Sequence, residues 1–382
     1  MCFILVVMRP VASLVLVLSL HTAVAQAPKV APSTEADDYL RKGIAAQEHG
    51  DYNSAINEYK KALALQPGLA EARANLGAAL AAAGQLDAAI EVDKEAIVTA
   101  PDKTAVRKNL ALAYYKKGDM EHAHTELEAV HAARPLDVSN AVLLGYTDIK
   151  LGKESEAATM LVPLEVGHES NMDLEYVLAF ALIDSGEEAA GVPRMEKVAK
   201  ATHSADAYFI AGSARLHRRE FHEARADLDA AIDLKATFPG LYTMAGQARD
   251  ALGDTDAALP AFQEALRADP RDFTANLYLG TMRLKQRDLE NARPLLELAL
   301  QLQPTAPMAR LEMAKLNGMT GKYAEAATTL EELEKMNPNW LDPHIELAAI
   351  YYKLHRSEDG QRERDIVQQI EAKQQKAGPP KQ

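Results

Sequence analysis

Apolar and polar residues alternate along the chain with the spacing of amphipathic helices. The stretch YNSAINEYKKALALQP, residues 52–67, gathers its alanines and Ile56 on one face and its charged residues on the other. It stops at Pro67, and the residue before a proline avoids α geometry. Only 5 % of the residues are aromatic and much of the apolar fraction is alanine, which favours closely packed helices over a β core.

This helical pattern returns along the chain at an interval of 34 residues. A proline closes most intervals, and the spacing across the middle of the chain is one residue short of four intervals, which indicates one deletion near residues 201–204. Repetition at this period is typical of stacked helical units. The prolines on this spacing are Pro67, Pro101, Pro135, Pro270, Pro304 and Pro338.

Other positions of the repeat are as regular as the proline, which is numbered 32 here. Position 8 is Gly or Ala in every unit, from Gly43 to Ala348, and position 20 is equally small. Position 15 is mostly glycine, replaced by Arg219, Arg287 and His355. Position 24 is large and apolar, with Asp93 as the exception; its other residues are Tyr59, Leu127, Leu161, Met195, Leu228, Phe262, Leu296 and Leu330.

Each of these positions has a physical reason in a pair of antiparallel helices. Glycine at position 15 takes the left-handed conformation that ends a first helix. The aspartates that follow it, such as Asp51 and Asp119, are suited to start a second helix. Small residues at positions 8 and 20 allow the two helices to cross closely, and the large residue at position 24 fills the space beside them.

The pattern resembles the tetratricopeptide repeat, which has small residues at positions 8 and 20, a large one at 24 and proline at 32. The resemblance covers about residues 36–356, in nine complete units and a tenth whose second helix is unclear. It implies an all-α fold, a right-handed superhelical solenoid of antiparallel helix pairs whose first helices line a concave groove. Each unit would bury its apolar face only against its neighbours.

The segments outside the repeats predict an exported protein. Arg9, an apolar run and the small residues Ala23 and Ala25 form a signal peptide over residues 1–25, with Met8 as an alternative start and an uncleaved anchor as the alternative fate. Residues 26–35 then form a linker, 357–376 a C-terminal capping helix and 377–382 a disordered tail. The expected compartment is the periplasm, with secretion as the alternative.

Charge and candidate chemistry narrow the function. The net charge is −13 and acidic and basic residues are interleaved, which argues against a nucleic-acid partner. Loss of residues 1–25 would remove Cys2, the single cysteine, and leave no membrane span. His122, His124 and His131 do not share a helix face, so they predict surface histidines rather than a metal site. We expect no catalytic residue, no cofactor and no enzymatic activity.

The groove is the expected binding site. In the third to sixth units, the positions that line it in this family are unusually apolar and aromatic, which predicts a surface for a peptide or protein partner. The alternative is that several of these side chains pack against the next helix as core. The residues are Leu112, Tyr115, Tyr146, Ile149, Tyr176, Phe180, Ile183 and Phe209.

The sequence therefore predicts a non-catalytic scaffold that binds a partner of unknown identity in its groove. The alternative is a structural component of a periplasmic envelope assembly or polymer-export complex.

The central units are the least regular part of the repeat array: Pro163 falls inside a second helix and Gly167 follows it. A proline there kinks a helix, so the segment is either a hinge between two halves or tolerated sequence drift.

Overall fold

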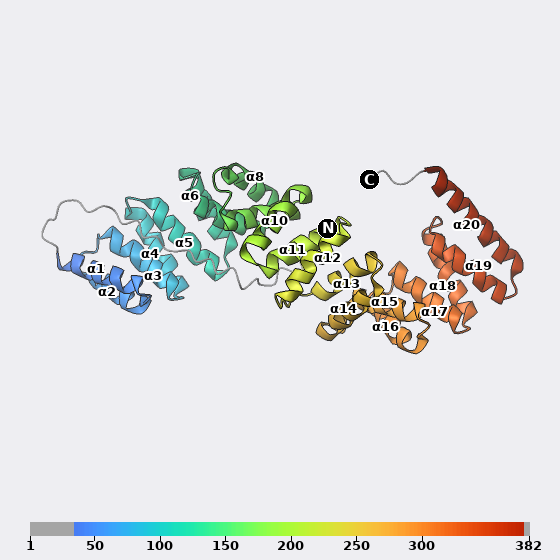
Figure 1. The fold of residues 1–382 in the computed structure, drawn as a ribbon. Helices are drawn as coiled ribbons and strands as arrows, with labels where there is room; N and C mark the ends of the chain where they lie inside the picture. Colours follow the sequence, from blue (N-terminus) through green and yellow to red (C-terminus); the bar gives the residue numbers. More distant parts are fainter. Residues whose placement is uncertain (1–33, 378–382) are drawn as a thin grey trace. The chain divides into compact units, whose positions relative to one another are not determined.

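A computed structural model describes residues 34–377, which form twenty α-helices and no strand. The chain divides within α11 into two compact units, Met1–Ala214 and Arg215–Gln382. Within each unit, consecutive helices run antiparallel and stack in chain order (Figure 1). The all-α solenoid of helix pairs that the sequence predicts is confirmed.

The helices are short, and most belong to pairs of a first and a second helix. Those that begin in the first unit are α1 (Glu35–Glu48), α2 (Tyr52–Leu65), α3 (Ala70–Ala82), α4 (Leu86–Thr99), α5 (Lys103–Lys117), α6 (Met120–Ala133), α7 (Val138–Lys150), α8 (Glu154–Glu165), α9 (Met172–Asp184), α10 (Glu188–Thr202) and α11 (Ala205–His217). The others are α12 (Phe221–Asp233), α13 (Leu241–Ala251), α14 (Thr255–Ala268), α15 (Phe273–Lys285), α16 (Leu289–Leu302), α17 (Pro307–Met319), α18 (Tyr323–Met336), α19 (Leu341–Lys353) and α20 (Ser357–Ala377).

The turn inside each pair has the predicted left-handed residue at position 15. Gly50 and Gly118, for example, have φ of 75° and 83°. Where the glycine is replaced the backbone keeps this conformation: Arg219, Arg287 and His355 have φ of 64°, 59° and 59°. The following aspartate caps the second helix as predicted, since Asp51 accepts a hydrogen bond from Ser54 N at 3.0 Å.

The close crossing of the two helices in a pair is also confirmed. A Cβ added to Gly246 would lie 2.7 Å from the Phe262 ring, and one added to Gly145 would lie 2.8 Å from Leu161 Cδ1. The residue at position 24 therefore packs directly on the backbone of position 8. The side chains of Phe262 and Leu161 are fully buried, so this contact is the centre of each pair's core.

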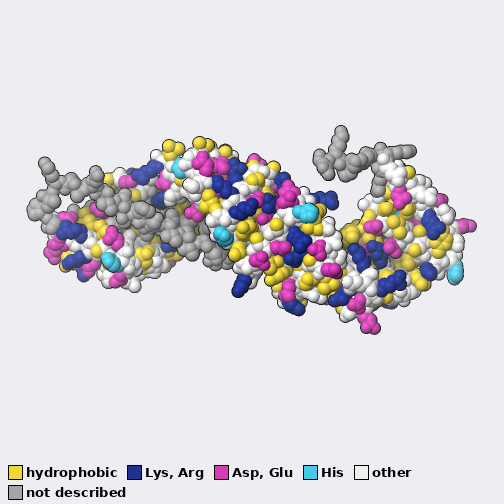
Figure 2. Space-filling model, in the orientation of Figure 1, with side chains coloured by type: hydrophobic (Ala, Val, Ile, Leu, Met, Phe, Trp, Pro, Cys, Tyr) yellow, Lys and Arg dark blue, Asp and Glu magenta, His cyan; other side chains and the backbone are white. Residues whose placement is uncertain are grey.

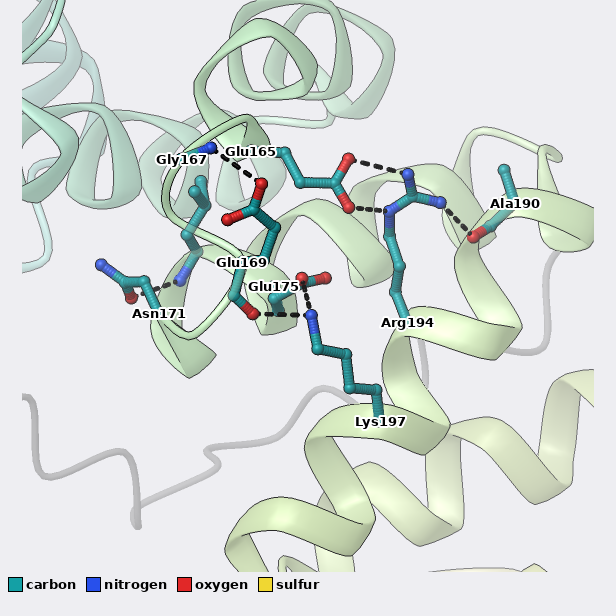
Figure 3. Close-up of polar contacts among 9 residues, drawn as sticks. Glu165, Gly167, Glu169, Asn171, Glu175, Ala190, Arg194 and Lys197 are labelled. Atoms are coloured by element: carbon teal, nitrogen blue, oxygen red, sulfur yellow. Dashed lines mark hydrogen bonds and ion pairs between the residues drawn. The ribbon is translucent and has the colours of Figure 1, made fainter.

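The irregular segment around Pro163 is tied to the next helix pair (Figure 3). Helix α8 contains Pro163 and ends at Glu165. Two atoms of the Arg194 guanidinium on α10, Nε and Nη2, donate to Glu165 at 2.9 and 2.8 Å. Lys197, one turn further, donates to the carbonyl oxygen of Glu169 at 2.6 Å. These bonds hold the α8–α9 connection against α10 and favour tolerated drift over a hinge.

The predicted signal peptide, most of the linker and nearly all of the tail lie outside the described residues. Helix α1 starts at Glu35 behind a capping box formed by Thr34 and Asp37. At the other end, α20 buries Ile370 and half-buries Ile366 and Val367. In residues 34–377 no helix combines the length and apolar character needed to cross a membrane.

Candidate partner-binding site

The eight predicted groove residues fall into two groups in the structure, all within the first unit. Four side chains are buried, with 3 to 6 % of their surface exposed: Ile149, Phe180, Ile183 and Phe209. The other four are half-buried and so accessible from solvent: Leu112, Tyr115, Tyr146 and Tyr176. Whether they bind a partner stays a prediction, and the accessible group is the part that can reach one.

Three residues of the buried group belong to the packing between neighbouring repeats. Ile149, Phe180 and Ile183 are part of one core cluster to which α7, α8, α9, α10 and α11 all contribute. The alternative interpretation, that several of these residues are core, therefore describes this group. An Ile or Phe in such a cluster stabilises the stack through the apolar area it removes from water.

Three accessible tyrosines come from three successive first helices: Tyr115 from α5, Tyr146 from α7 and Tyr176 from α9. We call these three residues the tyrosine row. The Tyr115 and Tyr146 rings meet edge to face with centroids 5.9 Å apart, a favoured arrangement for aromatic pairs. Tyr146 and Tyr176 pack on the same buried cluster. The row thus runs over three successive repeats.

The polar surroundings of the tyrosine row are mixed in charge. The ammonium group of Lys150 lies 5.3 Å from the centroid of the Tyr146 ring, within cation–π range. The Tyr176 hydroxyl donates a hydrogen bond to Asp206 Oδ2. Burial, and then the neighbouring Asp206 carboxylate, raise the pKa of Tyr176 above its ordinary value, and burial raises that of Asp206. The Tyr176 hydroxyl is therefore neutral at physiological pH.

A sequence profile described as "Tetratricopeptide repeat" matches residues 40–104 and 243–307, and a second profile of the same description matches residues 283–350. The matched segments contain the left-handed Gly50 and the crossing of Gly246 with Phe262 described above. The chain contains tetratricopeptide repeats. Such repeats present extended surfaces that act as scaffolds for protein–protein interaction.

Similar proteins share parts of this repeat array. Cellulose synthase operon protein C of Pseudomonas fluorescens (strain SBW25) is 32 % identical over 88 residues, which are 23 % of this chain and 7 % of that protein. The match thus spans only a small part of the curated relative. Among solved structures, a tetratricopeptide repeat protein from Parabacteroides merdae is 16 % identical with a TM-score of 0.47, covering 69 % of this chain and 98 % of its own.

A second solved structure is the C-terminal part of a repeat-containing protein from Cytophaga hutchinsonii. It is 18 % identical with a TM-score of 0.49, and it covers 60 % of this chain and 95 % of its own.

The surface of the present protein mixes acidic, basic and apolar side chains over the face shown in Figure 2. This interleaving agrees with the charge distribution along the sequence.

The predicted surface histidines have different surroundings in the structure. His122 is exposed, stacks on Tyr114 with ring centroids 4.9 Å apart and lies 2.9 Å from Asp119. His124 points elsewhere, with Nδ1 2.7 Å from the buried carboxylate of Asp148. Burial raises the pKa of Asp148, and His124 opposes that rise.

Sequence reasoning missed one cluster of potential metal ligands, formed by Glu334, His344 and Glu363. These residues stand 10 and 19 positions apart on α18, α19 and α20, so no local motif joins them. The sequence did contain one signal for this cluster, which is a departure from the usual residue type at one position of the repeat. Position 28 is usually apolar, as in Leu63 and Leu300, and Glu334 breaks that pattern.

Proposed function

We propose that this tetratricopeptide repeat protein binds a peptide or protein partner through the tyrosine row of its first unit. The observation that carries the proposal is the contact between the Tyr115 and Tyr146 rings at 5.9 Å, which joins accessible aromatic side chains of two repeats. Tyrosine supplies a large apolar contact area together with a polar group, and it is enriched among residues that dominate binding energy.

The structure around the row suits such a role. Each tyrosine rests on a rigid buried layer, so little side-chain freedom remains to be lost on binding. The partner would lay an extended or helical segment across α5, α7 and α9 and contact the aromatic rings. The mixture of Lys150 and Asp206 beside the row favours a partner segment with both charged and apolar residues.

The test is an affinity pull-down from envelope extract with residues 26–382 as bait. A second bait carries Tyr115→Ala and Tyr146→Ala. A third carries Tyr52→Ala as the matched control, because Tyr52 is a half-buried tyrosine outside the row. A protein held by the first and third baits and lost by the second supports the proposal. Equal capture by all three baits contradicts it.

The second candidate is a structural component of an envelope assembly or polymer-export complex. It is favoured by the local similarity to a protein named for a cellulose synthase operon, 32 % identical over 88 residues. In that case the protein would dock through another surface, and the tyrosine row would not matter. A set of envelope proteins captured equally by all baits is the outcome that distinguishes this candidate from the first.

Export to the periplasm is part of both proposals. It is supported by the apolar run after Arg9 and by the small residues Ala23 and Ala25, which suit a signal peptidase. Fractionation of cells that produce the full chain, followed by N-terminal sequencing of the periplasmic product, tests it. A product that starts at Gln26 agrees with the proposal, and an uncut cytoplasmic product contradicts it.

A further inference from the structure

The last three helices bring a histidine and two glutamates together in the second unit. Glu334 comes from α18, His344 from α19 and Glu363 from α20, and one ligand atom of each lies within 4.8 Å of the others. His344 is 1 % exposed and Glu363 7 % exposed, while Glu334 is half-buried. A buried group of this kind needs an internal partner for its charge.

The orientation of His344 turns one ring nitrogen, Nδ1, toward Glu363. Its Nε2 lies 3.0 Å from the carbonyl oxygen of Pro338, which only accepts hydrogen bonds, so Nε2 carries a proton and donates it. Nδ1 lies 2.6 Å from Glu363 Oε2, a hydrogen-bond distance, so a proton is shared between them; loss of that proton would expose the Nδ1 lone pair as a ligand. Metal-bound histidines typically donate their other N–H to a carbonyl or carboxylate in this way.

The same place in an earlier repeat shows what the cluster lacks. Glu165, at position 28 of its unit, corresponds to Glu334, and Arg194, at position 23 of the next unit, corresponds to Glu363. There the arginine neutralises the glutamate through two hydrogen bonds of 2.9 and 2.8 Å (Figure 3). In the last repeat a second carboxylate replaces that cation, so two acidic groups face each other.

A second cation of that earlier repeat is also missing from the last one. Lys197 pairs with the buried Glu175, which corresponds to His344 by position, and the residue that corresponds to Lys197 is Ile366. Within residues 34–377, moreover, no side chain makes a hydrogen bond or ion pair with Glu334.

We propose that Glu334, His344 and Glu363 form a binding site for a divalent transition-metal ion, with Zn²⁺ as the best fit. One imidazole and two carboxylates suit zinc, whose ligand atoms lie about 2.0–2.2 Å from the metal and hence about 3.3 Å from one another. Side-chain rotations would bring the three groups to that spacing, and water would fill the remaining position. An imidazole ligand disfavours Mg²⁺ and Ca²⁺, which prefer oxygen ligands.

Bound zinc would tie α20 to α18 and α19 and so fasten the last helix of the chain to the array. The competing occupant of the same space is a proton on His344 Nδ1. That proton would give the imidazole a positive charge. The ion pair between His344 and Glu363 would then neutralise the buried carboxylate without a metal ion. In that case the cluster would have no affinity for metal, and the two cases are separated by titration.

The experiment is isothermal titration of the full chain with ZnCl₂ after treatment with a chelator, in a Cys2→Ser background that removes the thiol ligand. His344→Asn keeps the donor to the proline carbonyl, as Asn276 donates to the carbonyl of Pro270 at 3.0 Å, but it lacks the Nδ1 ligand. Glu334→Leu restores the residue type usual at position 28. His122→Asn, which changes an exposed histidine, is the matched control.

The expected result is one Zn²⁺ per chain, with binding weakened at least about tenfold by His344→Asn and by Glu334→Leu and unchanged by His122→Asn. Zinc should also raise the unfolding temperature of the wild-type chain and not that of the His344→Asn chain. MgCl₂ should bind to neither. Absence of stoichiometric zinc binding, or equal affinity of the wild type and both ligand variants, would overturn the proposal.

Discussion

The carboxylate of Asp93 on α4 packs directly on the backbone of Gly77 on α3. A Cβ added to Gly77 would lie 1.9 Å from Asp93 Oδ1. Asp93 is fully buried, and neither carboxylate oxygen has a hydrogen-bond partner within residues 34–377. It takes the place that Leu161 fills beside Gly145, so an acidic group occupies a core position built for an apolar side chain.

We therefore expect Asp93→Leu to stabilise the protein. The change replaces an unpartnered buried carboxyl with the residue that fits the same position in other repeats, and the gain should be about 2 kcal/mol or more. Urea unfolding followed by circular dichroism at pH 7 measures it. A lower urea midpoint for Asp93→Leu than for the wild type would show that the position requires its acidic group.

The same residue should make stability depend on pH. Burial raises the pKa of Asp93 to about 8 from an ordinary value of 3.8. Between these values the folded state binds a proton that the unfolded state has lost, so the unfolding free energy falls as pH rises from about 4 to about 8. The slope from one such proton is at most about 1.4 kcal/mol per pH unit.

Asp93→Asn is the control for this pH effect, since the amide is similar in shape but does not titrate. Subtracting the pH profile of Asp93→Asn from that of the wild type should isolate the contribution of this carboxyl. A difference profile that is flat between pH 4 and pH 8 would show that Asp93 titrates near its ordinary pKa.

Much of the fold could be predicted from the sequence because each repeat position has one local physical role. The left-handed glycine at Gly118, the cap at Asp119 and the crossing of Gly246 with Phe262 depend on contacts within a single helix pair. Those contacts repeat along the chain, so their pattern is visible in the sequence alone.

The accessible surface was harder to predict because burial depends on neighbouring repeats. Tyr146 and Phe180 both occupy positions expected to line the groove, yet adjacent helices bury Phe180 and leave Tyr146 half-exposed. Helical periodicity places a residue on a face but does not say how far the next repeat reaches over it. The cluster of Glu334, His344 and Glu363 was missed for the same reason, because its residues come from three different helices.

The difference in burial between Phe180 and Tyr146 predicts that alanine substitutions at these two positions have different effects on stability. Phe180→Ala removes a buried ring from the core and should cost about 3–5 kcal/mol of unfolding free energy. Tyr146→Ala removes a half-buried ring and should cost about 1 kcal/mol. Urea unfolding of both variants checks this. Equal destabilisation would mean that Tyr146 is as much a part of the core as Phe180.

The left-handed arginine at position 15 offers a stabilising change. Arg287 has φ of 59°, a conformation that costs a residue with a side chain about 1 kcal/mol relative to glycine. Arg287→Gly should therefore raise the unfolding free energy by up to about 1 kcal/mol, reduced by the greater freedom of glycine in the unfolded chain. Thermal unfolding measures the change, and a lower midpoint would contradict the expectation.

The bond between Glu165 and Arg194 should stabilise the α8–α9 connection. A double-mutant cycle with Glu165→Gln and Arg194→Met should give a coupling energy of about 1 kcal/mol, because the pair is bidentate and half-buried. Amide hydrogen exchange should accelerate in residues 166–171 of the single variants. Unchanged exchange there would show that the ion pair does not restrain the connection.

The most direct test of the binding surface is site-specific photo-crosslinking within cells. A photoreactive amino acid replaces Tyr146 in one chain and Val98 in another, since Val98 is 77 % exposed on the second helix α4 and lies outside the tyrosine row. The account predicts a defined crosslinked partner from position 146 and none from position 98. The same partner from both positions, or none from position 146, would contradict the claim that the tyrosine row binds a protein.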